Sequence, residues 1–306
     1  MKKWSRARKI WVGTSLVLVL TVGTVVYKLA DRYLIEHVEA VVTTTASTST
    51  VESAHATYDD WNYSSDNETI NIKKVQTGSG SDMITYFVAD VTLKNGATIQ
   101  TALADNKFGR NITENTSTIA ESSNAVLAIN GDYYGFRDDG VIIRNGTLYR
   151  DEPARDGLAL FQDGTMKSYD ETEVSSADLI AQGVTNTFSF GPILVQDGEV
   201  ASDFEHVEID TNFGNRSIQN ANPRTGIGII DANHYVLVVV DGRSQNYSRG
   251  MTLTEFADLF KDLGATDAYN LDGGGSSTMY FMGKVINNPQ GKGQERGVSD
   301  IIYVGA

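Results

Sequence analysis

The sequence predicts an α+β fold: a strand-rich domain of mixed and mainly antiparallel sheet with few helices, preceded by a transmembrane helix. Three observations predict it. Short β-type runs bounded by Gly, Asn or Asp recur along most of the chain, one helix is strongly amphipathic, and one long segment near the N-terminus carries no charge. With 306 residues, of which 41% are hydrophobic, the chain can bury a sizeable core, which excludes global disorder.

The N-terminal segment predicts a membrane anchor. Five bases and no acid fall within residues 1–9, which we assign to a cytoplasmic tail, and Ile10–Tyr27 follows without a charge. As a helix this run spans roughly 27 Å, close to the hydrocarbon thickness of a bilayer. We therefore place a transmembrane signal-anchor at 10–30. A cleaved signal peptide is the alternative, but its apolar region is normally shorter and ends at a small-residue cleavage site.

The charge distribution predicts where the rest of the chain works. Because positive charge stays in the cytoplasm, everything after the anchor is expected outside, as a single-pass cell-membrane protein with an extracellular C-terminal domain. The absence of Cys favours a Gram-positive bacterial surface protein and excludes disulfides, thiolate nucleophiles and Cys-bound zinc. With 25 bases against 39 acids, nucleic acid is not expected as a partner.

The rest of the chain divides into a stalk and one domain. Residues 31–66 include the low-complexity run Thr43–Thr50 and predict a Ser/Thr-rich stalk, whereas regular patterning over 67–306 predicts one domain of catalytic size. The expected strands are Ile84–Leu93, Ala125–Ile129, Val141–Arg144, Leu158–Phe161, Ser189–Val195, Gly226–Ile230, Tyr235–Val240, Ala268–Leu271, Thr278–Phe281 and Val298–Val304.

Turn and cap signals specify how these elements connect. Pairs such as Asn145-Gly146 and Asp197-Gly198 favour tight hairpins, so antiparallel pairing should dominate. Thr252 and Glu255 form a capping box ahead of an apolar face that ends at Gly264, which predicts an amphipathic helix packed on a sheet. This helix joins two expected strands and so indicates a strand–helix–strand unit.

The segment Tyr269–Thr278 is the strongest candidate for a functional site. Asp272 stands at a strand end, followed by three glycines and three hydroxyl residues. A glycine run lets the backbone approach a ligand closely, and its successive N–H groups can form an anion-binding nest. A hinge or a flexible hairpin is the alternative interpretation. We favour a site because apolar strands flank both sides of the turn.

Three other segments place charged residues at strand ends beside glycine: Asn130–Tyr134, Asn222–Gly226 and Asp241–Arg243. Arginines suit phosphate oxygens, aspartates suit acid, base or nucleophile roles or hold the arginines in place, and tyrosines stack on sugar rings. An anion and a sugar are the implied ligand. We expect these segments and Asp272–Thr278 to converge on one site.

These motifs, with the closing Glu295–Asp300 segment, resemble the ordered motifs of the phosphodiester glycosidase family over roughly residues 80–306. The resemblance implies an extracytoplasmic hydrolase that cleaves sugar-1-phosphodiester bonds in a cell-surface or exopolysaccharide substrate. A catalytic set of Asp272, Asp132 and Asp241 is expected, with Asp272 first and Asp132 second for stabilising charge on the sugar. The expected substrate- and phosphate-binding residues are Asn130, Gly131, Tyr133, Arg224, Thr225, Arg243, Gly273, Gly274, Gly275, Ser276, Ser277, Thr278, Glu295 and Arg296.

Other chemistries fit the sequence less well. Neither Ser276 nor Ser277 is followed by the glycine of a nucleophile elbow, no phosphate-binding P-loop motif occurs, and the four histidines form no zinc motif. A hard cation such as Ca²⁺ on Asp132, Asp138 or Asp139 is an alternative, but the spacing of these acids is not that of an EF-hand loop. We expect neither a metal nor a cofactor. The alternative from another class is a non-catalytic surface module that binds an anionic cell-wall polymer with the same residues.

Overall fold

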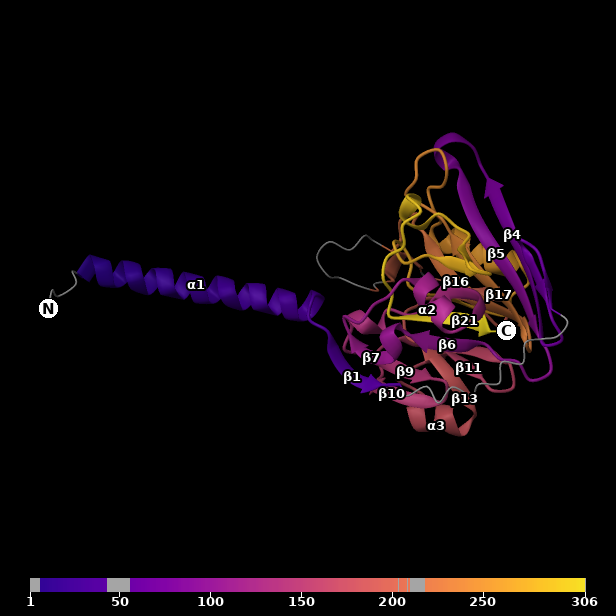
Figure 1. Cartoon of the computed structure of the whole chain (residues 1–306), viewed down its shortest axis with the longest axis horizontal. Coiled ribbons are helices and arrows are strands. Elements are labelled where there is room, and N and C mark those ends of the chain that lie inside the picture. Colours follow the sequence, from indigo (N-terminus) through magenta and orange to yellow (C-terminus); the bar gives the residue numbers. More distant parts are fainter. Residues whose placement is uncertain (1–5, 43–55, 203, 208, 210–217, 306) are drawn as a thin grey trace.

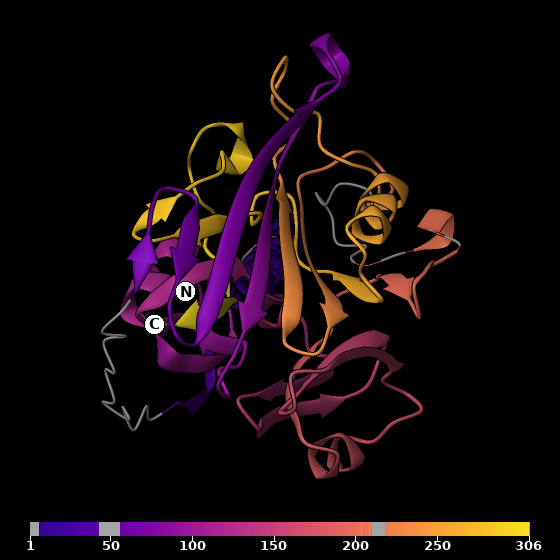
Figure 2. The same cartoon turned by 90° about the vertical axis from the view of Figure 1, so that its right-hand side faces the viewer.

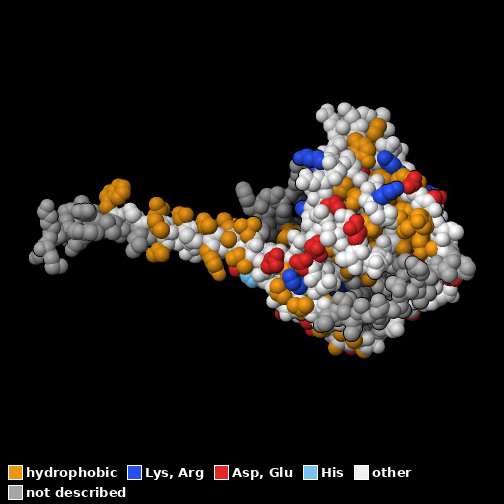
Figure 3. All heavy atoms as spheres, viewed as in Figure 1, with side chains coloured by type: hydrophobic (Ala, Val, Ile, Leu, Met, Phe, Trp, Pro, Cys, Tyr) orange, Lys and Arg blue, Asp and Glu red, His pale blue; other side chains and the backbone are white. Residues whose placement is uncertain are grey.

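The computed structural model describes residues 6–42, 56–202, 204–207, 209 and 218–305. Figure 1 shows a sheet-rich body from which helix α1 (Arg6–Tyr33) projects as a rod. The large apolar side chains described on this helix are exposed, including Val17–Leu20 and Val25–Tyr27 (Figure 3). In the part of the chain described here, no helix is both long and apolar enough to cross a membrane.

The largest sheet within the described residues has nine strands, in the order β15-β14-β18-β16-β17-β5-β4-β3-β2, and every ladder in it is antiparallel. Its strands are β2 (Thr57–Tyr58), β3 (Asn62–Ser64), β4 (Glu68–Thr77), β5 (Ile84–Leu93), β14 (Ile193–Gln196), β15 (Glu199–Val200), β16 (Arg224–Asp231), β17 (His234–Val240) and β18 (Asp267–Asn270). The long β4–β5 hairpin rises past the rest of the body (Figure 2).

A second sheet has five strands among the described residues, in the order β20-β19-β8-β21-β6, and smaller sheets flank the two. The five strands are β6 (Gln100–Leu103), β8 (Ala125–Asn130), β19 (Met279–Phe281), β20 (Lys284–Val285) and β21 (Asp300–Gly305). The remaining strands are β1 (His37–Val41), β7 (Lys107–Arg110), β9 (Gly140–Arg144), β10 (Thr147–Glu152), β11 (Asp156–Phe161), β12 (Met166–Asp170) and β13 (Val184–Phe188).

Side-chain alternation explains the layers. On β5 and β17, Phe87, Leu237 and Val239 face a core shared with β8, β19 and β21, so the main core lies between the two large sheets. The intervening residues, such as Val236 and Val238, face the other side of the sheet and pack in a second core with helix α4. The expected strand-rich α+β architecture with few helices is confirmed.

Helix α4 (Leu253–Asp262) begins where the sequence predicts. Thr252 and Glu255 form the reciprocal capping box, and the rings of Phe256 and Phe260 pack in the core between the helix and the sheet. Gly226 and Gly228 on β16 leave room for these rings, because a Cβ on either would lie within 3 Å of one. The other helices are α2 (Thr116–Ser122) and α3 (Ser176–Ala181), and short 3-10 turns span Gly80–Asp82, Ala104–Asn106, Tyr134–Phe136, Phe204–His206 and Pro289–Gly291.

One connection differs from expectation, whereas the tight turns do not. The helix α4 joins β17 to β18, but β16 lies between these strands and pairs antiparallel with both, so the unit contributes no parallel ladder. The tight turns behave as predicted: Asn145-Gly146 joins β9 to β10 with φ of 49° and 78°, the left-handed pair that such a hairpin requires.

The segment predicted to be a stalk contains paired strands. Within 31–66, β1 pairs with β7, and β2 and β3 join the nine-stranded sheet. Asn111 also donates hydrogen bonds to the carbonyl groups of Asp31 and Ile35 at the end of α1. Ordered structure thus begins before the predicted domain start at residue 67. The low-complexity run Thr43–Thr50 lies outside the described residues.

Candidate active site

The Asp272–Thr278 loop crosses from one large sheet to the other. Strand β18, which precedes it, belongs to the nine-stranded sheet, and β19, which follows it, belongs to the five-stranded sheet. Asn130 at the end of β8 holds the crossing: its Nδ2 donates to the Asp272 carbonyl at 2.7 Å, and its Oδ1 accepts from the Thr225 hydroxyl at 2.7 Å and from Thr278 N at 3.2 Å. Asn130 and Thr225 are therefore braces beneath the loop.

Asp272, Ser276 and Arg296 form a compact polar cluster at the start of this loop. The Ser276 hydroxyl donates to Asp272 Oδ2 at 2.5 Å, and Arg296 Nη2 donates to the same carboxylate oxygen at 3.1 Å. Arg296 also donates to Ser276 Oγ, with Nε at 3.1 Å. The Arg296 side chain is 47% exposed and that of Asp272 is 11% exposed, so the cluster reaches solvent through the arginine.

Burial raises the pKa of Asp272 above its usual range. The Arg296 guanidinium, the Ser276 hydroxyl and the more distant Arg137 guanidinium act in the opposite direction because they stabilise the carboxylate. Asp272 is thus a desolvated carboxylate under the influence of two arginines, and its cluster reaches solvent through Arg296. Such sites are where catalytic acids and bases are usually found.

The glycine run lets two arginines lie across the loop. A Cβ on Gly274, whose φ is 64°, would stand 3.1 Å from Arg243 Nη2, and a Cβ on Gly275 would stand 3.2 Å from Arg296 Cδ. Gly273 is equally constrained, since its Cβ would stand 2.8 Å from the Pro223 carbonyl oxygen. The loop N–H groups are less free than a nest requires, because Gly274 N and Ser276 N donate to the carbonyls of Pro223 and Gly273.

Arg243 and Arg224 occupy different surroundings. Arg243 is exposed, and its Nη2 donates to Asn222 Oδ1 at 2.9 Å. Arg224 is buried and donates to the carbonyls of Met251, Ile218 and Asn220. Burial, with a smaller contribution from Arg243, lowers the pKa of Arg224 to about 10. The Arg224 side chain therefore holds the preceding loop in place and does not reach solvent.

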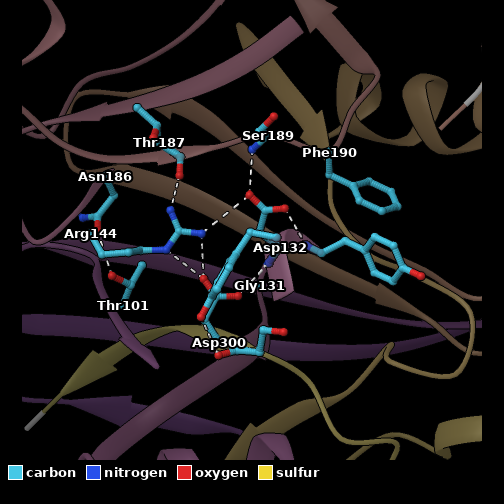
Figure 4. A network of polar contacts seen from close by, with 12 residues as sticks. Thr101, Gly131, Asp132, Arg144, Asn186, Thr187, Ser189, Phe190 and Asp300 are labelled. Atoms are coloured by element: carbon cyan, nitrogen blue, oxygen red, sulfur yellow. Dashed lines mark hydrogen bonds and ion pairs between the residues drawn. The ribbon is translucent and has the colours of Figure 1, made fainter. Parts of the chain in front are cut away.

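Asp132 is fully buried beside Arg144 and Asp300 (Figure 4). Its Oδ2 accepts from Ser189 N at 2.7 Å and its Oδ1 accepts from Tyr133 N. With a side-chain exposure of 0%, it cannot contact a sugar in this conformation. This differs from the expectation that Asp132 is a catalytic carboxylate.

Asp241 is likewise committed to the protein. Its carboxylate accepts from Asn287 Nδ2 at 2.9 Å, from Asn288 N at 3.0 Å and from the Tyr247 hydroxyl at 2.8 Å. Burial raises its pKa, and these donors together with Lys74 oppose that effect. The residue therefore ties two loops together instead of offering a free carboxylate.

Other expected binding residues also contact the protein interior or are buried in it. Glu295 accepts from Ser117 N at 3.0 Å and from the Ser117 hydroxyl, so it caps the first turn of α2. Gly131 leaves room for Asp300, because a Cβ there would stand 2.4 Å from Asp300 Oδ1. The hydroxyls of Ser277 and Thr278 are buried and have no hydrogen-bond partner in the described structure.

Sequence reasoning missed an arginine beside Tyr133. The Arg137 guanidinium lies 5.1 Å from the ring centroids of both Tyr133 and Phe190, and its charge acts on Asp272. Arg137 also donates to the Ser189 and Ile209 carbonyls. Its place four residues after Tyr133, within an aromatic and charged loop, is the only signal that the sequence carries for it. No set of three or more His, Asp or Glu residues in the described chain is arranged to hold a metal ion.

The fold matches that of a solved catalytic domain. The structure matches the catalytic domain of zebrafish N-acetylglucosamine-1-phosphodiester alpha-N-acetylglucosaminidase, solved in a form auto-inhibited by its pro-peptide, with a TM-score of 0.61 and 20% identity. The match covers 79% of this chain and 84% of that one. At this identity the likeness establishes the fold.

The sequence establishes the family. The model of the phosphodiester glycosidase family matches residues 123–305, so the chain belongs to that family of hydrolases. The expected membership in the phosphodiester glycosidase family is confirmed. The matched range includes every expected site residue from Asn130 to Arg296.

Two curated relatives are similar over part of their length. An uncharacterised SPbeta prophage-derived protein of Bacillus subtilis, YomE, is 35% identical over 206 residues, covering 64% of this chain and 30% of that protein. The bovine N-acetylglucosamine-1-phosphodiester alpha-N-acetylglucosaminidase is 30% identical over 140 residues, covering 44% of this chain and 26% of the bovine protein. The chain thus spans less than a third of either relative.

Proposed function

We propose that this chain hydrolyses the bond between the anomeric carbon of a sugar and a phosphodiester oxygen, releasing the free sugar and a phosphomonoester. The Asp272–Ser276–Arg296 cluster is the observation that carries the proposal, because it sets a desolvated carboxylate beside a cation that reaches solvent. The bovine and zebrafish relatives bear the name of an enzyme of this kind.

The chemistry follows from the leaving group. When the bond from the anomeric carbon to oxygen breaks, the electron pair goes to a phosphate oxygen, and water supplies the new hydroxyl on the sugar. Phosphate leaves readily, so the enzyme needs positive charge on the phosphate more than it needs a general acid. Arg296 and Arg243, which lie across adjacent glycines, are suited to that task.

Asp272 would stabilise the positive charge that develops on the sugar, and Ser276 and Arg296 hold its carboxylate in place. Both carboxylate oxygens of Asp132 and both of Asp241 accept hydrogen bonds from loop N–H groups or side-chain donors. Neither residue therefore offers a free carboxylate oxygen to a substrate. Asp272 is therefore the residue to which we assign catalysis.

The experiment follows the position of bond cleavage. The purified chain is incubated with a panel of sugar-1-phosphodiesters in water enriched in ¹⁸O, and the products are analysed by mass spectrometry. Label in the free sugar and none in the phosphomonoester supports the proposal. Label in phosphate would show a phosphodiesterase instead, and tight binding without product would favour the non-catalytic polymer-binding module.

We further propose that the domain acts outside the cytoplasmic membrane on a cell-surface or exopolysaccharide phosphodiester, with the N-terminal segment 10–30 as the anchor that its uncharged sequence predicts. The basic tail at residues 1–9, the uncharged run Ile10–Tyr27 and the exposed apolar side chains along α1 support this. Protease added to intact cells should remove a C-terminal tag and leave an N-terminal tag protected. Protection of both tags in cells with a permeable wall would contradict this orientation.

A further inference from the structure

A buried ionic network lies directly beside the candidate site. Arg144 donates from Nε to Asp300 Oδ2 at 2.8 Å, and its Nη2 lies 2.7 Å from the same oxygen and 3.5 Å from Asp132 Oδ2. Figure 4 shows the guanidinium between the two carboxylates. The side-chain exposures are 2% for Arg144 and 0% for each acid, so no solvent screens these charges.

The network is bonded to three consecutive backbone N–H groups. Gly131 N donates to the Asp300 carbonyl at 3.0 Å, Asp132 N donates to Asp300 Oδ1 at 2.8 Å, and Tyr133 N donates to Asp132 Oδ1. Ser189 N adds a fourth bond, to Asp132 Oδ2. The Gly131–Tyr133 segment is therefore held from three sides, by β9, β21 and the end of β13.

The guanidinium itself has a fixed place. Arg144 Nη1 donates to the carbonyls of Ile143 and Thr187, and the rings of Phe188 and Tyr134 lie 4.6 and 5.4 Å from its centre. Two carboxylates that share one arginine in a dry site carry an excess negative charge. The desolvation of these charges costs free energy, so such a network contributes little net stability to a core. Apolar residues of similar size often serve stability equally well, whereas directional bonds serve position.

The segment Gly131–Tyr133, which this network holds, directly follows Asn130, the residue that holds the Asp272–Thr278 loop in place. Asn130 donates to the Asp272 carbonyl, and Tyr133 ends the segment with its ring beside Arg137. A shift of Gly131–Tyr133 must therefore move Asn130 or break its bonds to Asp272, Thr225 or Thr278. Errors of about 1 Å in the placement of reacting groups cost large factors in rate.

We propose that Arg144 and Asp300, with Asp132, are positioning residues that hold Asn130 and through it Asp272 in the geometry required for cleavage. The proposal rests on the function proposed above. It gives Asp132 a role in orientation in place of direct contact with the sugar.

The test compares Arg144→Lys and Asp300→Asn with Arg249→Lys in the full chain. Arg249 also pairs with a carboxylate, Glu255 of α4, but lies outside the network. On a phosphodiester that the wild type cleaves, we expect kcat to fall at least about ten-fold in the two network variants with KM changed less than two-fold, and to stay unchanged in the control. Wild-type kcat in folded Arg144→Lys would overturn the proposal.

A second readout does not depend on activity. Amide hydrogen exchange should rise in 130–134 and in 271–278 in Arg144→Lys, and stay unchanged in the β4–β5 hairpin. Unchanged exchange in both site segments would overturn positioning even if no substrate is cleaved, whereas raised exchange with an inactive wild type would refute only the proposed function. If Arg144→Lys fails to fold, Asp132→Asn keeps the size of the side chain and is judged by the same exchange pattern.

Discussion

Two aspartate–arginine arrangements lie within one site region and differ in their access to solvent. In the Asp132–Arg144–Asp300 network every charged side chain is almost completely buried and bonded to the protein. In the Asp272–Ser276–Arg296 cluster the arginine side chain is 47% exposed. The first arrangement can only orient backbone, while the second can meet an anion. Residue type alone therefore does not assign a role, because exposure decides which partner a charge can have.

Neutralising the carboxylate of Asp272, in the cluster with the exposed arginine, should have the largest effect on activity. Asp272→Asn keeps size and the contact with Ser276 but loses the negative charge, so we expect kcat to fall at least about a hundred-fold with KM little changed. Steady-state kinetics on a sugar-1-phosphodiester measure this. Asp258→Asn, on the exposed face of α4, is the matched control. Full turnover by a folded Asp272→Asn protein would remove Asp272 from the chemistry.

Adding a methyl group beside the buried Asp132–Arg144–Asp300 network should have the next largest effect, on stability. Gly131→Ala places a Cβ 2.4 Å from Asp300 Oδ1, so the carboxylate or the backbone must move. We expect unfolding free energy to fall by about 1–3 kcal/mol, the usual cost of overpacking. Urea denaturation measures it, with Gly305→Ala as the control at the other end of β21, where the nearest contact is an ordinary 3.5 Å. Equal stability of the two variants would mean that the network tolerates displacement.

Changing the exposed arginine should separate charge from geometry. Arg296→Lys keeps the charge but loses the forked donors to Asp272 and Ser276, so KM for a phosphodiester should rise about ten-fold. Arg243→Lys should also raise this KM, mainly by weakening phosphate binding. An uncharged aryl glycoside is the comparison substrate in both cases. Equal losses on the two substrates would argue against a phosphate contact for either arginine.

The buried arrangement should also show in the pH dependence of stability. Burial raises the pKa of Asp300 from 3.8 to about 6, with Asp132 contributing and Arg144 opposing. The folded state then holds a proton that the unfolded state releases, so this residue's contribution to stability falls as pH rises from about 4 to 6, by at most about 1.4 kcal/mol per pH unit. Asp300→Asn should lack this slope in urea titrations across that range. An identical slope in wild type and variant would contradict the shifted pKa.

Local signals predicted elements well. The capping box of α4 and the left-handed Asn145-Gly146 turn depend on neighbours in the chain, and both formed as predicted. Periodicity predicted β5, β16 and β17 because one face of each strand is buried in a core. Strands such as β1 and β4 were not predicted. Strand β1 depends on pairing with β7, which lies far from it in the sequence. The two strands approach closely at Gly109 of β7, where a Cβ would stand 1.9 Å from the His37 carbonyl oxygen.

The sequence by itself determined the family, the sheet-rich fold and the loops that form the site, because motifs, turns and alternation are written in adjacent residues. Only the tertiary structure decided which charges face solvent. Asp132, Asp241 and Asp272 all follow strands beside glycine, yet two are enclosed by donors from distant segments and one meets an exposed arginine. That difference arises from long-range packing of the two sheets, since burial and partner choice are properties of the folded surface and are not encoded within any one motif.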